Sequence, residues 1–294
     1  MTALALDIGA TKFAAAVVDS NGELGEPQRI QVPETGVWDA CRKLLTNVAG
    51  ETRVTAVGIG SAGPVDVTAG TCGPLNIPEW VHGFPIVESV RKVFPEAEIR
   101  FAIDGACLVL AEQRLGAARG VPDVLAMTVS SGIGGGILSG GRVVLGRTGN
   151  GGHVGHIVVP GNAEPCACGG FGCVEAVASG KSSVRWARRQ GWPGGTGVEL
   201  AAAARAGEPV AVAALERAGT AIGTAVASAA ALLDIDLVVI GGGFAQSGEL
   251  LWEPLRSAAA AHARLSFVRG LRVVPSELTD QATLQGAALL ALGD

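Results

Sequence analysis

The sequence carries little charge and has no excess of basic residues. Only 17% of its 294 residues are charged, and 22 Lys and Arg stand against 27 Asp and Glu, for a net charge of −5. Nucleic acids and anionic membranes are bound through an excess of Lys and Arg, so we expect neither as a partner. The 48% of apolar residues are typical of a folded protein, and the length suits one large domain or two ordinary ones.

Long hydrophobic runs and a secretion signal are also missing. The most apolar stretch, Ala221 to Leu233, is shorter than a membrane span. The opening residues, MTALALDIGATK, lack the basic segment and cleavage site of a signal peptide. We therefore expect a cytoplasmic protein without a transmembrane helix. In that reducing compartment the six cysteines favour a metal site over disulfides.

Glycine, by contrast, is abundant. The 44 glycines are about twice the usual share of ~7%, and they cluster directly after apolar runs, as in tight loops at strand ends. One cluster separates Leu4–Ile8 from Phe13–Val18, and another separates Val124–Val129 from Ile137-Leu138. The chain therefore looks like two related halves, each opening with a strand, a glycine turn and a returning strand.

Strands alternate with helical segments along the rest of the chain. The expected strands are 54–59, 99–103 and 237–240, and the expected helices are 38–48, 108–117 and one on each side of the last strand. This alternation predicts an α/β protein with mixed sheets and a cleft between its halves. The Gly- and Pro-rich loop 68–78 is a candidate lining for that cleft.

Glycine loops in both halves have the residues of a phosphate site. The run from Asp7 to Lys12 (DIGATK) offers backbone N–H groups, a hydroxyl and an ammonium, with a carboxylate near which Mg²⁺ could bind. The same run would also suit an ordinary hairpin with a surface lysine. A second loop, Ser130 to Gly136, favours the phosphate interpretation, because a nucleotide lying across a cleft needs donors from both sides. A third cluster, Gly241 to Gly243, could let adenine or ribose approach the backbone.

Three cysteines and a histidine give the strongest chemical signal. His156, Cys166, Cys168 and Cys173 supply three thiolates and an imidazole, and the intervening glycines let the chain wrap tightly. Packing alone does not explain three cysteines within eight positions. The pattern predicts structural Zn²⁺ in a closed site, since four protein ligands leave no coordination position open.

Asp104 follows the expected strand 99–103 and precedes a helix. Its carboxylate is therefore expected at the carboxyl edge of a sheet, near a helix N-terminus. Without further context, the pattern favours a helix-capping role for this residue.

Taken together, the motifs resemble the ROK family of sugar kinases and regulators over essentially the whole chain. DIGATK, GIGSAGP, SGIGGG, GHVGH followed by CACGGFGC-V-E, and VVIGGG occur in the family's order and spacing. The resemblance implies an actin-like (ribonuclease H-like) fold of two α/β domains, with ATP and Mg²⁺ in the cleft between them. We expect the first domain at 1–105, completed by a C-terminal helix at about 281–294, and the second at 106–280 with its zinc segment at 153–175.

The same resemblance implies phosphoryl transfer to a sugar hydroxyl, usually the 6-OH. Asp104 matches the family's catalytic base, which displaces the capping interpretation: a carboxylate must orient the alcohol and accept its proton. The implied sugar contacts are Gly63, Asn76, Asp104, His153, His156 and Glu175. The implied ATP and Mg²⁺ contacts are Asp7, Gly9, Ala10, Thr11, Lys12, Ser131, Gly132, Ile133, Gly134, Gly135, Gly242 and Gly243.

Departures from the family pattern bear on the substrate. His153 stands where the family's glucokinases have Glu, as it does in bacterial N-acetylmannosamine kinases, and this favours an N-acetylhexosamine. Ile103 replaces a sugar-binding Asn and Ala106 another polar residue, whereas Asn76-Ile77-Pro78 with Trp80 looks like the glucokinase version. N-acetylmannosamine kinase is the first prediction. Glucokinase and a catalytically weak sugar sensor are the alternatives.

The family also includes repressors, which carry a DNA-binding domain before the kinase-like part. Here the first strand is expected to begin at residue 4, so we do not expect such a domain. By resemblance to the family, and because the second half is rich in Ala, we expect a homodimer.

Overall fold

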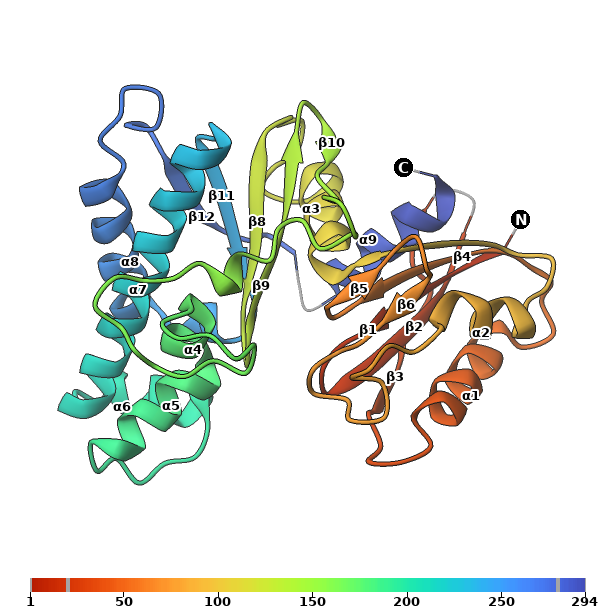
Figure 1. Cartoon of the computed structure of the whole chain (residues 1–294), viewed down its shortest axis with the longest axis horizontal. Coiled ribbons are helices and arrows are strands. Elements are labelled where there is room, and N and C mark those ends of the chain that lie inside the picture. The colour runs from red at the N-terminus through yellow and green to blue at the C-terminus, as the bar shows by residue number, and fades with distance from the viewer. Residues whose placement is uncertain (1, 20–21, 279–280, 294) are drawn as a thin grey trace. The chain divides into compact units, whose positions relative to one another are not determined.

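The computed structural model describes residues 2–19, 22–278 and 281–293. The chain divides into two compact units (Figure 1). The first unit comprises residues 1–114, 142–152 and 281–294, and the second comprises residues 115–141 and 153–280. Each unit is built around a mixed sheet, and the two five-stranded sheets follow the same order of strands.

The first sheet has the order β3-β2-β1-β4-β7. Its strands are β1 (Thr2–Ile8), β2 (Lys12–Val18), β3 (Gln28–Gln31), β4 (Val54–Ser61) and β7 (Glu98–Ile103). β1 runs antiparallel to β2 and parallel to β4, and β4 runs parallel to β7. The carboxyl ends of β1, β4 and β7 therefore lie at one edge of the sheet, where Ser61 stands opposite both Ile8 and Ile103.

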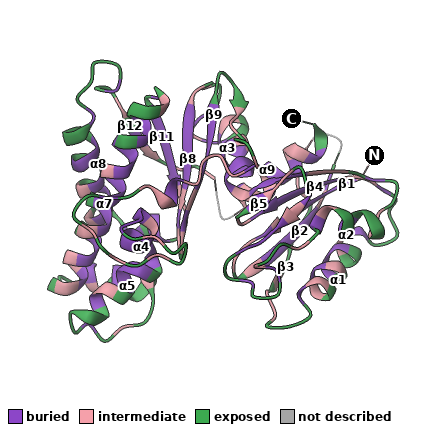
Figure 2. Cartoon of the chain, in the orientation of Figure 1, coloured by how far each residue is buried: buried purple, intermediate pink, exposed green. Residues whose placement is uncertain are grey.

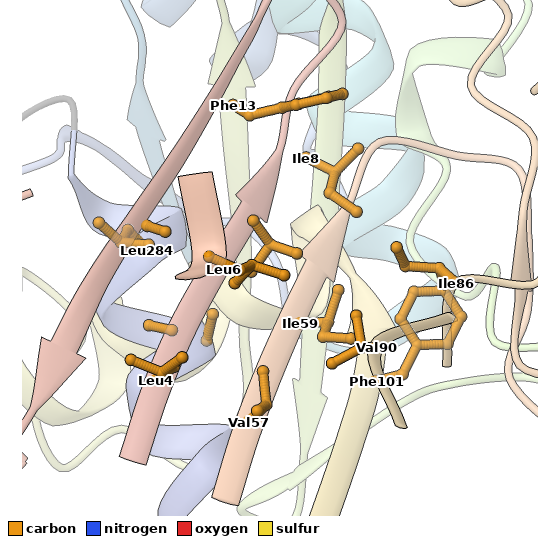
Figure 3. Packing of buried hydrophobic residues seen from close by; sticks show 14 of the residues in the cluster. Leu4, Leu6, Ile8, Phe13, Val57, Ile59, Ile86, Val90, Phe101 and Leu284 are labelled. Carbon is orange, nitrogen blue, oxygen red and sulfur yellow. The ribbon is translucent and has the colours of Figure 1, made fainter. Parts of the chain in front are cut away.

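Four helices and a small hairpin complete the first unit. They are α1 (Val37–Ala49), α2 (Ile86–Val93), α3 (Asp104–Leu115), α9 (Ala282–Leu292) and the pair β5 (Val65–Asp66) and β6 (Thr71–Cys72). Consecutive residues of β1 from Ala3 to Leu6 are all buried, so the sheet is covered on both faces (Figure 2). Figure 3 shows Leu6 and Ile59 of the sheet in one apolar cluster with Val90 of α2 and Leu284 of α9.

The second sheet has the order β10-β9-β8-β11-β12. Its strands are β8 (Val124–Val129), β9 (Ile133–Ser139), β10 (Arg142–Val143), β11 (Leu237–Gly241) and β12 (Arg272–Pro275). β8 is antiparallel to β9 and parallel to β11, which is parallel to β12. The carboxyl ends of β8 and β11 thus meet at one edge, as those of β1 and β4 do in the first sheet.

The helices of the second unit gather around one long helix. They are α4 (Val174–Ala178), α5 (Gly180–Arg189), α6 (Gly197–Arg205), α7 (Pro209–Leu233) and α8 (Glu249–His262), with short 3₁₀ turns at Val154–His156 and Phe244–Ser247. α7 and α8 pack closely because Gly219 and Gly223, one turn apart, face the backbone of Leu251 and Leu255.

α7 is longer than its most apolar part. The sequence alone predicts no membrane span, because the apolar stretch 221–233 is too short. In the structure the helix already starts at Pro209, and with 25 residues it is long and apolar enough to cross a membrane. Within the described part of the chain it is the one such helix, and 61% of its most apolar window is buried inside the structure. Burial of that kind is typical of a core helix in a globular protein.

Most predicted elements are confirmed, including both strand–turn–strand openings, at β1–β2 and β8–β9. One prediction is wrong: the glycine run 130–136 is not a loop throughout, because β9 begins at Ile133. Thr128 pairs with Gly134 and Met127 with Gly135, so pairing with β8 overrides the low strand propensity of glycine. The helix expected at 108–117 also starts earlier, at Asp104.

The close approach of α9 to β4 yields a stability prediction. A Cβ on Gly58 would overlap the carbonyl oxygen of Ala287 and lie 2.7 Å from the backbone nitrogen of Ala291. We expect Gly58→Ala to lower the free energy of unfolding by about 1–3 kcal/mol, measured by urea denaturation. Gly270→Ala is the matched control, because nothing lies within 4 Å of its added Cβ. Equal stability of the two variants would contradict this packing.

Candidate active site and metal centre

The turn between β1 and β2 is shaped by a glycine. The Gly9 N–H donates to the Lys12 carbonyl oxygen at 3.0 Å, and a Cβ on Gly9 would lie only 2.9 Å from that same oxygen. Thr11 is exposed at the tip of the turn, where its carbonyl accepts the Val32 N–H at 3.0 Å. The turn thus presents Thr11 and the N-terminal end of β2 at the edge where β1 ends.

Asp7 and Asp104 interact across this edge. Burial raises the pKa of Asp7, the negative charge of Asp104 raises it further, and Lys12 and Arg29 only partly offset this, leaving a pKa of about 7. Burial and then the same two carboxylates also raise the pKa of the Cys107 thiol well above its ordinary value. A buried carboxylate whose proton affinity is raised by a second carboxylate nearby has the character of a divalent-cation site, because such an ion would relieve their repulsion.

Asp104 is the first residue of α3, and its Oδ1 accepts the Gly105 N–H at 2.7 Å. The carboxylate therefore lies against the positive end of the helix while remaining partly exposed. Its neighbours Ile103 and Ala106 are 1% and 2% exposed and belong to the apolar core of the first unit. Asp104 is therefore partly exposed at the end of β7, while the residues next to it in sequence are buried.

The segment that carries Asn76 is held in place by stacked aromatic rings and by hydrogen bonds from the start of α1 to the Glu79 carboxylate. Trp80 stacks on Phe84 with ring centroids 4.4 Å apart and on Phe13 at 5.6 Å. Glu79 accepts the backbone N–H groups of Gly36 at 2.7 Å and Val37 at 3.0 Å, so it caps α1 from a distant part of the chain. Asn76 itself is exposed, and so is available to a ligand.

In the second unit, several backbone segments converge on Ser130–Gly132. The Gly180 N–H, at the start of α5, donates to the Ser130 carbonyl at 2.8 Å. Gly242, with φ of +100°, packs so closely that an added Cβ would lie 2.5 Å from the Val129 carbonyl oxygen. The predicted ATP residues of this unit, from Ser131 to Gly135 and at Gly242 and Gly243, therefore come together at the ends of β8 and β11.

Glu175 has a role that its sequence motif does not reveal. Its Oε2 accepts the Ile133 N–H at 2.8 Å, and a Cβ on Gly132 would lie only 2.6 Å from that oxygen. The carboxylate, predicted as a sugar contact, therefore also ties α4 to the glycine turn. Gly155 packs against the Ile133 carbonyl without room for a side chain, which brings the segment of His153 and His156 to the same turn.

The four predicted metal ligands form one cluster. The ligand atoms of His156, Cys166, Cys168 and Cys173 all lie within 4.8 Å of one another. Cys166 Sγ is 3.7 Å from His156 Nδ1, and Cys168 Sγ is 3.7 Å from Cys173 Sγ. Two sulfurs bound to one tetrahedral zinc at 2.3 Å lie about 3.8 Å apart, so both the donor set and its spacing suit Zn²⁺.

Backbone turns shape this cluster. The Cys166 N–H donates to the Gly170 carbonyl at 2.8 Å, and Gly169 and Gly172 have φ of +88° and +72°, a region that favours glycine. With Nδ1 facing the cluster, His156 keeps Nε2 for a second partner. The His153 ring lies 5.5 Å from the His156 ring, and burial followed by the charge of His156 lowers the pKa of His153.

Arg217 of α7, which lies outside every motif, bonds to the segment 153–175 and to α4. The Arg217 guanidinium donates to the Val177 carbonyl at 2.6 Å, and to Asn162 Oδ1 and Glu164 Oε1 at 3.2 Å each. Its charge therefore organises a chain stretch that has little regular secondary structure. A single Arg in an Ala-rich helix gives no signal in the sequence, so sequence reasoning misses it.

The electrostatics of Asp7 predict a pH-dependent stability. Its pKa of about 7 in the folded protein exceeds the ordinary value of about 3.9, so the folded state binds the proton more tightly and loses stability as pH rises through this window. In metal-free buffer we expect Asp7→Asn to melt above the wild type at pH 8 and close to it at pH 4.5. Asp39→Asn, at an exposed position on α1, is the control. A gain independent of pH would contradict the raised pKa of Asp7 in the folded protein.

Comparison with known proteins gives matches along the whole chain. The sequence profile described as the ROK family matches residues 3–294. A glucokinase of Thermotoga maritima is 33% identical over 97% of this chain and 95% of its own, and an N-acetylmannosamine kinase of Escherichia coli is 31% identical over 100% and 99%. The crystal structure of a ROK family glucokinase from Streptomyces griseus, in complex with glucose and AMPPNP, superposes with a TM-score of 0.86 at 32% identity and covers both chains completely.

The duplicated sheet order, the glycine turns at the strand ends and the His/Cys cluster are thus found in a chain that matches one family from end to end. The chain belongs to the ROK family and has the actin-like ATPase fold of that family's sugar kinases.

Proposed function

We propose that the protein is an ATP-dependent sugar kinase, with Asp104 as its catalytic base. The observation that carries the proposal is the interaction of Asp104 with Asp7 at the carboxyl edge of the first sheet. Relatives named as glucokinase and N-acetylmannosamine kinase, about as long as this chain, support the same activity. We also propose that the chain has the two domains implied by the family resemblance, 1–105 completed by about 281–294, and 106–280. The two compact units follow this division except that residues 106–114 and 142–152 belong to the first unit.

In the proposed reaction, Asp104 accepts a hydrogen bond from the sugar hydroxyl and takes its proton as the oxygen attacks the γ-phosphorus of ATP. The bond between that phosphorus and the bridging oxygen breaks, and ADP leaves with the bridging oxygen and its electron pair. Its place at the start of α3 keeps the carboxylate oriented through the Gly105 N–H. The backbone N–H groups of the two glycine turns and Lys12 offset phosphate charge. Mg²⁺, when bound with ATP beside Asp7, would supply positive charge to the phosphate oxygens.

For the substrate we propose an N-acetylhexosamine, with N-acetylmannosamine and its 6-OH as the first choice. His153 supports this choice, because the two ring nitrogens of an imidazole can donate to and accept from an amide group. Glucose is the alternative, supported by the similarity to named glucokinases.

We propose that the protein acts in the cytoplasm as a homodimer. Light scattering at micromolar concentration can test the dimer.

We further propose that the cluster of His156 and the three cysteines binds one structural Zn²⁺. With four protein ligands the ion would have no open position, so its role would be to fix the segment from His153 to Glu175. His156 would then bind zinc through Nδ1 and a sugar hydroxyl through Nε2.

The central test is Asp104→Asn. Losing the base should lower the rate of sugar-dependent ADP release by about 10²–10⁴-fold, while sugar binding measured by calorimetry persists, because the amide keeps the shape of the carboxylate. The control is Asp39→Asn, at an exposed position on α1, which should keep full activity. If the wild type binds a sugar and Asp104→Asn releases ADP just as fast, the protein is a sensor with an unrelated ATPase activity.

The zinc proposal is tested by elemental analysis. We expect about one zinc per chain in the wild type, and a much lower content together with a lower melting temperature in Cys168→Ser. Cys72→Ser, a change at a buried cysteine outside the cluster, should keep its zinc and is the control. Fully active wild-type protein without metal would contradict the structural role.

A further inference from the structure

Residues 142–152, here called the strap, belong to the first unit although the residues before and after them belong to the second. The strap opens with β10, which pairs with β9 of the second sheet, and it leads directly into His153. Its own backbone folds back, with the Gly151 N–H donating to the Leu145 carbonyl at 2.8 Å. Beyond β10 the strap has no helix or strand, so specific contacts must hold it.

Asn150 supplies these contacts through both ends of its side-chain amide. Its Oδ1 accepts the Val65 N–H at 2.9 Å, and its Nδ2 donates to the Val65 carbonyl at 2.6 Å and to Thr148 Oγ1 at 2.9 Å. The side chain thus pairs with the edge of the β5–β6 hairpin as the peptide group of a third strand would. Only an amide offers a donor and an acceptor in this arrangement, because a carboxylate has no donor and a methyl group has neither.

Backbone contacts fix the strap in the same register. The Val67 N–H donates to the Thr148 carbonyl at 3.0 Å. Gly149, with φ of +96°, packs against Val67 so closely that any side chain there would overlap it. A Cβ on Gly151 would likewise overlap the Val144 carbonyl oxygen. The fit leaves no room for the strap to slide along the hairpin.

The two ends of this contact lie next to predicted sugar residues. Val65 is two residues after Gly63, and Asn150 is three residues before His153. The Pro64 carbonyl, between Gly63 and Val65, also accepts the Gly73 N–H at 2.8 Å, which leads toward the segment of Asn76. A single side-chain amide therefore fixes the chain near residues that the family resemblance assigns to the sugar.

We propose that Asn150 is a positioning residue for sugar binding: by clamping Val65 it holds Gly63 in register with the strap that leads to His153. The inference rests on the proposed sugar kinase function, and it adds a residue that no motif marks. It concerns the sugar rather than ATP, because the glycine turns assigned to phosphate lie outside the strap and the β5–β6 hairpin.

The test compares Asn150→Ala and Asn150→Asp with the wild type in steady-state kinetics, using glucose and N-acetylmannosamine as substrates. Both variants should raise the KM for the sugar roughly five- to tenfold, as expected when hydrogen bonds of ordinary strength no longer hold the site, and leave the KM for ATP unchanged. Asn150→Asp keeps the shape of the side chain but places an oxygen where Nδ2 donates to the Val65 carbonyl. If Asn150→Ala does not fold, the comparison rests on Asn150→Asp.

Thr148→Val is the matched control, since it removes only the hydroxyl beside Asn150 and keeps the Thr148 carbonyl bonded to Val67. Its sugar KM should stay within about twofold of the wild type. In hydrogen exchange, the Val65 and Val67 amides should exchange faster in Asn150→Ala than in Thr148→Val.

The possible outcomes separate the two claims. An active wild type together with unchanged sugar KM values in both Asn150 variants overturns the positioning role and leaves the kinase function standing. Equal rises in the KM for sugar and for ATP with a lower melting temperature also overturn it, because they indicate a general loss of structure. A wild type that phosphorylates no sugar overturns the proposed function, and this inference with it.

Discussion

The repulsion between Asp7 and Asp104 is the constraint on which the proposed chemistry depends. The two carboxylates lie at the ends of parallel strands, where burial and then the negative charge of Asp104 raise the pKa of Asp7 to about 7. Such a pair is unfavourable by itself, and a divalent cation bound between the carboxylates would reduce their repulsion. The positive charges of Lys12 and Arg29 offset the repulsion only in part, so a bound cation would lower it further.

In the second unit, close packing of glycine residues, rather than charged side chains, shapes the corresponding turn. The turn at Ser130–Gly132 is contacted by the start of α5, by Gly242 and by Glu175, and several of these approaches exclude a Cβ. Glycine lets these backbone segments approach one another without a side chain in the way. The cluster of His156 and the three cysteines and the contacts of Arg217 both lie in the segment from His153 to Glu175, which has little regular structure of its own.

Local patterns were enough to predict the parts of the structure that depend on residues close in sequence. The strands, their glycine turns and the His/Cys cluster all follow from spacing and residue type, and the structure confirms them. The strand content of 133–136 could not be predicted, because it comes from pairing with β8 rather than from the glycines themselves. For the same reason the roles of Arg217, Glu79 and Asn150 were not visible: each acts on a backbone group far away in sequence.

The central claim is that a sugar, and not water, receives the phosphoryl group. It is tested most directly by phosphorus and proton NMR of the products formed from ATP, Mg²⁺ and a panel of glucose, mannose, N-acetylglucosamine and N-acetylmannosamine. The account predicts one preferred sugar converted to its 6-phosphate, with ADP formed in equal amount. Formation of ADP and free phosphate without any sugar phosphate, or no turnover with a sugar that binds, would contradict it.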